Sequence, residues 1–142
     1  MLSFGVKALA VGEGQVYFTT KPKDKEVFVG QRVQFDWDYT APDAHELRFG
    51  VIVNDQEAAI VVKNLKDGSL KFNNMHDSIK WIRDRVEAVP GRRASFTINP
   101  VSMEDSVTFF CSLIYGEAKK SVPDKVKLTV VGKWGLVQGK MA

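Results

Sequence analysis

Few side chains in this sequence could act as a nucleophile or bind a metal ion. Cys111 is the single cysteine, and His45 and His76 are the two histidines. A catalytic thiol needs an adjacent base and an accessible, electropositive site. Cys111 instead lies in an alternating apolar run, which predicts a buried, inert thiol. Structural zinc needs four ligands, so the two histidines are expected in exposed loops or connections rather than on a metal.

Two carboxylates, Asp36 and Asp38, alternate along one expected strand and are the nearest approach to an acid–base pair or a calcium ligand set. Alternation alone places both on the solvent face. The sequence has no glycine-rich phosphate loop, Cys-x-x-Cys pair or nucleophile elbow. We therefore expect no enzyme activity, no metal and no cofactor.

Composition and charge are those of an ordinary globular chain. Of 142 residues 44% are hydrophobic, and 20 Lys and Arg stand against 17 Asp and Glu, which gives a net charge of +3. The basic residues are scattered, whereas nucleic-acid binding usually needs a concentrated basic face. No apolar stretch approaches the roughly 18 residues of a membrane span. The length suits one domain.

The elements that must position these side chains are strands. Period-two alternation, bounded by turn signals about every ten residues, predicts an all-β sandwich or barrel. Residues 73–84 fit a short helix or a ragged strand, 101–105 a connection with one helical turn, and 116–124 a polar loop. The expected strands cover residues 16–20, 26–29, 32–39, 47–53, 58–63, 70–72, 85–89, 94–98, 106–115 and 125–131.

Two segments resemble the core strands of immunoglobulin domains. The run from Asp105 to Cys111 resembles the motif Asp-x-Ala-x-Tyr-x-Cys, and the run from Val33 to Trp37 resembles the strand that supplies the partner cysteine. Trp37 and Cys111 lie 74 positions apart (111 − 37), a spacing that suits the variable type with its two extra strands. The resemblance implies an immunoglobulin-like, V-type two-sheet sandwich of about nine strands with Greek-key connections.

The resemblance also implies which residues fill the core. Trp37 stands in place of one cysteine, and Phe49 or Val51 stands in place of the usual tryptophan, so that with Phe49 the core exchanges Cys–Cys–Trp for Trp–Cys–Phe around Cys111. The indole N–H of Trp37 then needs a hydrogen-bond partner or a partly wet position. Phe109 replaces the tyrosine of the motif and lacks its hydroxyl.

An ion pair and the domain limits follow from the same resemblance. In variable-type domains an arginine pairs with the aspartate of the motif, and Arg85 and Asp105 occupy those positions. Residues 15–131 are expected to form the domain. Residues 1–14 are expected to be a disordered leader or cloning remnant, and 132–142 a flexible tail or linker.

One outward sheet face is expected to bind a partner. Alternation places an apolar row there, and contiguous exposed apolar patches often mark interaction sites. The alternative is that the chain's own tail, around Trp134 and Leu136, covers it. The candidate face residues are Arg48, Gly50, Ile52, Phe110, Ser112, Ile114 and Val131.

The function implied by the resemblance is extracellular recognition or adhesion. The divergent cysteine pattern is similar to that of invertebrate cell-recognition receptors, including allorecognition types. This similarity implies that the partner is another protein or a second copy of this domain. It also implies that the domain belongs to a membrane-anchored parent protein. One alternative is a soluble defence protein that binds microbial carbohydrate or lipid through loops 41–46 and 116–124. Another is an intracellular scaffold module, which the lone cysteine favours and the 74-residue spacing disfavours.

Overall fold

The structure is a computed structural model that describes residues 16–73 and 77–132. Within these ranges the chain is mostly β and forms two sheets, as the alternation predicts. Short helical segments occupy Asp77–Ile79 (a 3-10 turn), Lys80–Arg83 (α2) and Met103–Asp105 (a 3-10 turn). The strands are β1 (Tyr17–Thr20), β2 (Lys25–Phe28), β3 (Val33–Thr40), β4 (Ala44–Val53), β5 (Gln56–Asn64), β6 (Leu70–Phe72), β7 (Val86–Ala88), β8 (Ala94–Ile98), β9 (Thr108–Tyr115) and β10 (Lys120–Val131).

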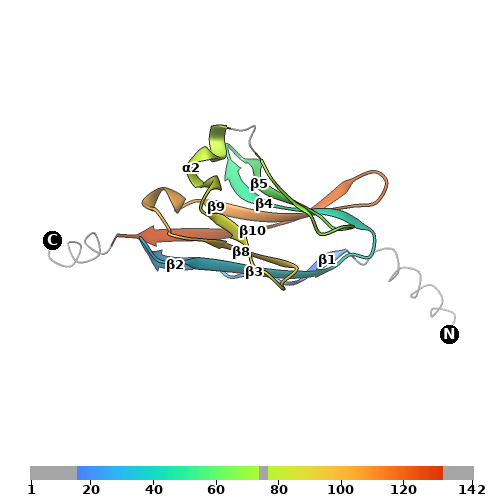
Figure 1. The fold of residues 1–142 in the computed structure, drawn as a ribbon, viewed down its shortest axis with the longest axis horizontal. Coiled ribbons are helices and arrows are strands. Elements are labelled where there is room, and N and C mark those ends of the chain that lie inside the picture. The colour runs from blue at the N-terminus through green and yellow to red at the C-terminus, as the bar shows by residue number, and fades with distance from the viewer. Residues whose placement is uncertain (1–15, 74–76, 133–142) are drawn as a thin grey trace.

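The two sheets form separate layers (Figure 1). One has four strands in the order β1-β3-β8-β7, and the other has six in the order β2-β10-β9-β4-β5-β6. Neighbouring strands are antiparallel except β2 and β10, which are parallel. Among the described residues no helix has the length and apolar character needed to cross a membrane.

The core lies between the two sheets and is rich in aromatic rings. Alternate side chains of β3, from Val33 to Tyr39, are buried, and the residues between them are not. Phe49 of the six-stranded sheet stacks on Phe96 of the opposite sheet, with ring centroids 4.5 Å apart. Phe49 also stacks on Phe109 at 5.8 Å. Such ring pairs add to the free energy gained from burying apolar area.

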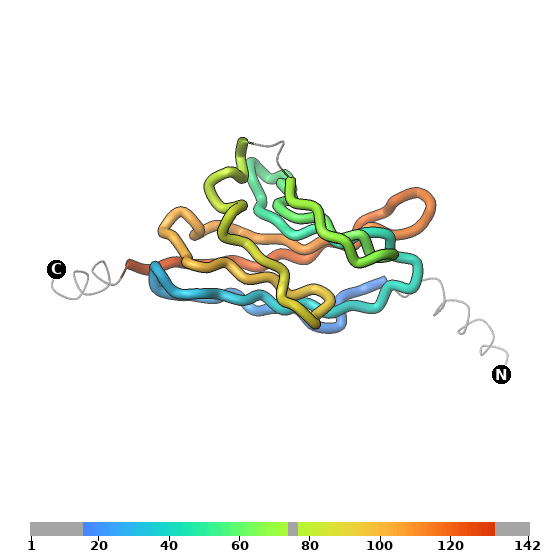
Figure 2. The backbone as a smooth tube through the Cα atoms, in the orientation of Figure 1, coloured from blue at the N-terminus to red at the C-terminus, as the bar shows by residue number. Residues whose placement is uncertain are grey.

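Two expectations about local structure are wrong. Residues 116–124 are not a loop, because β10 begins at Lys120 and pairs with β9 from Tyr115 onward. Only the turn between the two strands remains, and Figure 2 shows the hairpin projecting beyond the neighbouring strands. The polar side chains of this stretch are mostly exposed, while its backbone is paired, so polarity alone is misleading there. His45 lies in β4 rather than in a loop, and it is half-buried.

Some expectations fall outside the residues that the structure describes. His76 and residues 1–14 belong there, as do residues 133–142 of the expected tail. Residues 77–83 adopt the short helical form, one of the two alternatives that the sequence allows for 73–84.

Candidate binding surfaces

Strand register gathers the predicted binding residues on the outer face of the six-stranded sheet. Phe110 of β9 lies opposite Gly50 of β4, and Ser112 lies opposite Arg48. Ile114 follows Ser112 by two positions, so its side chain points to the same face. The residues between them, such as Cys111, point into the core. We call this surface the outer face.

The expectation of an exposed apolar row is wrong at the centre of this face. Phe110 and Ser112 are 0% exposed and Ile114 is 7% exposed, while Ile52 and Val131 are partly exposed. Alternation tells which side of a sheet a residue occupies, but not how far its neighbours cover it. These three side chains lie on β9, which has a neighbouring strand on both sides.

Polar and charged side chains on the outer face contact one another next to the buried residues. The Ser112 hydroxyl donates a hydrogen bond of 2.8 Å to Glu57, and Arg48 Nε lies 2.6 Å from a carboxylate oxygen of Glu46. Lys125 of β10 lies opposite Phe110 in the strand pairing and is exposed, so it adds a positive charge to the same face. The face therefore combines a buried apolar floor with charged groups that reach solvent.

Gly50 holds β4 and β5 unusually close at a bulge in their pairing. A Cβ atom placed on Gly50 would lie 2.0 Å from the carbonyl oxygen of Ala58, which is far inside van der Waals contact. Only glycine permits this approach. Gly50 thus contributes to the shape of the outer face rather than to its chemistry.

Arg85 and Asp105 form a two-pronged ion pair at the end of the sandwich. The guanidinium nitrogens donate to the two carboxylate oxygens at 2.7 and 2.8 Å, and Asp105 is fully buried. These hydrogen bonds raise the pKa of the Arg85 guanidinium. Asp105 also accepts from the backbone N–H of Ser102 at 2.7 Å, which caps the short helical turn at Met103–Asp105. The pair is structural, because its carboxylate has no access to solvent.

The indole of Trp37 finds its partner on the other sheet. Its Nε1–H donates a hydrogen bond of 2.8 Å to Asp124 of β10, and Asp124 lies opposite Cys111 in the β9–β10 pairing. Trp37 packs edge-on against Phe49, with ring centroids 5.8 Å apart. Burial raises the pKa of the Cys111 thiol well above its usual value, so the thiolate needed for nucleophilic chemistry is disfavoured.

Asp36 and Asp38 do not form a carboxylate pair. Asp38 lies 2.7 Å from a guanidinium nitrogen of Arg93, and Asp36 lies 3.6 Å from Arg92. The hydrogen bonds from Arg93 lower the pKa of Asp38. The Arg93 guanidinium also sits 4.1 Å from the ring centroid of Tyr39. Each carboxylate thus has its own arginine, and neither is set up as a general acid or base.

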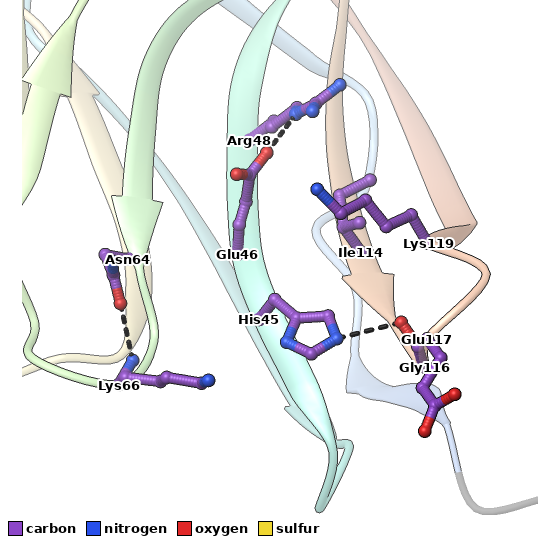
Figure 3. Close-up of a pocket in the computed structure, with 9 residues that line it drawn as sticks. All are labelled: His45, Glu46, Arg48, Asn64, Lys66, Ile114, Gly116, Glu117 and Lys119. Atoms are coloured by element: carbon purple, nitrogen blue, oxygen red, sulfur yellow. Dashed lines mark hydrogen bonds and ion pairs between the residues drawn. The ribbon is translucent and has the colours of Figure 1, made fainter.

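A pocket of about 440 Å³, with both polar and apolar lining, opens at one end of the outer face (Figure 3). The imidazole Nε2–H of His45 donates a hydrogen bond of 2.8 Å to the carbonyl oxygen of Gly116. That bond joins β4 to the turn between β9 and β10. The pocket is lined by His45, Glu46, Arg48, Asn64, Lys66, Ile114, Gly116, Glu117 and Lys119.

The sequence gives only a partial signal for this pocket. The segments 41–46 and 116–124, expected as binding loops in the carbohydrate alternative, both contribute to the lining. Asn64 ends β5 and Lys66 lies in the β5–β6 turn, and the sequence connects neither residue to those segments. Their convergence depends on strand pairing between segments far apart in the chain.

Comparison with known proteins does not identify a family for this chain. No family model matches the sequence, and no curated protein matches it. Within residues 16–73 and 77–132, no three His, Cys, Asp or Glu side chains are grouped so that they could hold a metal ion.

Proposed function

We propose that this chain is a variable-type immunoglobulin-like recognition domain that acts outside the cell and binds a second copy of itself through the outer face. The strand order carries the proposal. Variable-type domains have one four-stranded sheet, and a second sheet in which two extra strands lie next to each other beyond the strand that corresponds to β4. The order β2-β10-β9-β4-β5-β6, beside β1-β3-β8-β7, matches that plan.

Two side-chain arrangements add support. On this proposal Trp37 and Cys111 take the positions of the usual disulfide, and the hydrogen bond from Trp37 to Asp124 provides a link between the sheets. The ion pair of Arg85 with the buried Asp105 supports the same proposal, because variable-type domains pair an arginine with the motif aspartate.

The charges on the outer face favour a copy of the same domain as partner. Arg48 and Lys125 stand near Glu46 and Glu57 on one surface. A two-fold axis brings the same patch of both copies together, so each patch must be complementary to itself. Mixed charges around a buried apolar floor meet that requirement, whereas a face of one sign would repel its copy.

Bead aggregation tests the proposal. Beads coated with the chain should aggregate, and Lys125→Glu should abolish aggregation because it reverses one of the positive charges of the self-complementary face. Lys23→Glu carries the same charge change on the exposed connection between β1 and β2 and should aggregate like the wild type. The proposal fails if wild-type beads stay dispersed, or if both variants behave alike. Phe110 is unsuitable for this test, because a charge at its fully buried position would disturb folding.

A further inference from the structure

We propose that the pocket at the end of the outer face binds an acidic saccharide, a sugar whose ring carries a carboxylate. This ligand is separate from the protein partner proposed above, and the inference stands without that partner. It rests on how the pocket walls are held, on which charged groups are unpaired, and on the mixture of donors and acceptors.

Three chain segments form the walls, and hydrogen bonds hold each one in place. His45 of β4 reaches the carbonyl oxygen of Gly116 at 2.8 Å, which fixes the β9–β10 turn. The backbone N–H of Leu65 donates to the carbonyl oxygen of His45 at 2.9 Å, which fixes the β5–β6 turn. Asn64 accepts from the backbone N–H of Lys66 at 2.8 Å and shapes that turn (Figure 3). A pocket with walls fixed in advance loses less conformational entropy when a ligand binds.

Two ammonium groups are available to a carboxylate. Lys66 and Lys119 are both exposed, and in the described part of the chain neither forms an ion pair. Arg48 differs from them, because its guanidinium is already paired with Glu46 at 2.6 Å. Hydrogen bonds between an ammonium and a carboxylate are among the strong ones. The two lysines therefore select for a negative charge on the ligand.

The other lining groups select against a simple anion. Glu46 and Glu117 would repel a compact multivalent anion such as phosphate, but their oxygens can accept hydrogen bonds from sugar hydroxyls. Ile114 offers an aliphatic surface to the C–H face of a ring. The volume of about 440 Å³ lies within the range of small-molecule sites. Donors, acceptors and one apolar contact together suit a hydroxylated ring with a single carboxylate.

Titration by two-dimensional NMR at constant ionic strength tests the inference. A galacturonate disaccharide should bind saturably and shift the backbone amides of Lys66 and Gly116. Maltose, which has the hydroxyls without the carboxylate, should bind at least about tenfold more weakly, equivalent to about 1.4 kcal/mol. Inorganic phosphate and a triglutamate peptide should also bind more weakly, since each lacks the hydroxylated ring.

Matched lysine variants locate the site. Lys66→Gln and Lys119→Gln should each weaken galacturonate binding about tenfold, as expected for the loss of one charge-assisted hydrogen bond. Lys127→Gln makes the same change toward the opposite end of the β9–β10 hairpin and should leave binding unchanged. The inference is overturned if galacturonate gives no saturable shifts, if phosphate or triglutamate binds equally well, or if both pocket variants bind like the wild type. Dispersed spectra of all three variants would establish that each is folded.

Discussion

The indole nitrogen of Trp37 lies 2.8 Å from a carboxylate oxygen of Asp124, and this hydrogen bond joins the two sheets. Asp124 lies opposite Cys111 in the pairing of β9 with β10, so the hydrogen bond forms beside this cysteine. A polar contact therefore links the two sheets beside the single cysteine. Stability at this point depends on a buried donor having its acceptor, and that dependence can be measured.

Replacing the acceptor should separate hydrogen bonding from packing. Asp124→Leu leaves the indole N–H of Trp37 without a partner and should lower the free energy of unfolding by about 1–3 kcal/mol. Asp124→Asn keeps an acceptor oxygen and should cost less than about 1 kcal/mol. Urea unfolding measures both. Equal losses in the two variants would mean that the hydrogen bond does not stabilise the fold.

The ion pair of Arg85 and Asp105 should matter far more than the surface pairs. Arg85→Met leaves a fully buried carboxylate without its cation and should cost about 3–5 kcal/mol of unfolding free energy. Arg93→Met breaks a half-exposed pair with Asp38 and should cost less than about 1 kcal/mol. Urea unfolding of the two variants provides the comparison, and similar losses would argue against a structural role for Arg85.

Gly50 should tolerate no side chain. The Cβ of Gly50→Ala would meet the carbonyl oxygen of Ala58 at 2.0 Å, so β4 and β5 must separate, at a cost of about 1–3 kcal/mol or more. Gly68→Ala is the comparison, because its Cβ would point into open space and only the left-handed backbone, with φ of +76°, opposes it. Thermal unfolding should show the larger loss for Gly50→Ala. A smaller loss than for Gly68→Ala would contradict the close approach of the two strands.

Cys111 should be inert in the folded protein and visible in the pH dependence of stability. The unfolded thiol ionises near its ordinary value of 9.0, whereas burial raises the pKa of the folded thiol well above it. Its contribution is therefore fully present below about pH 9 and declines as pH rises further, by at most about 1.4 kcal/mol per pH unit. Cys111→Ala should remove this part of the decline.

Thiol labelling checks the same point by a second route. A thiol-specific reagent should modify the wild-type protein at the rate of unfolding, and much faster in urea. Rapid labelling of the native protein would contradict the burial of Cys111. An unchanged pH slope in Cys111→Ala would show that the thiol does not contribute to it.

The sequence predicts which side chains face the core between the two sheets better than it predicts which contacts they make and which residues are exposed. Alternation from Val33 to Tyr39 is local information, and it correctly predicts which side chains of β3 are buried. The partner of Trp37 is Asp124, which lies 87 positions away, so only the folded pairing reveals it. The burial of Phe110 likewise depends on neighbouring strands rather than on its own segment.

The pocket shows the same limit of local patterns. His45 and Gly116 lie 71 positions apart and meet through pairing of β4 with β9. Polarity predicts a loop at 116–124, yet most of that stretch pairs with β9 because backbone hydrogen bonds form regardless of the exposed side chains. The position of a binding site at strand ends therefore requires the topology.

Sedimentation equilibrium over a wide concentration range tests directly whether the outer face binds a second copy of this chain. We predict reversible dimerisation of the wild type, a monomeric Lys125→Glu variant, and wild-type behaviour for Lys23→Glu. Dimerisation should also weaken as salt is added, because charges across the interface are screened. A wild-type chain that stays monomeric at the highest concentration, or a Lys125→Glu variant that dimerises as the wild type does, would contradict it.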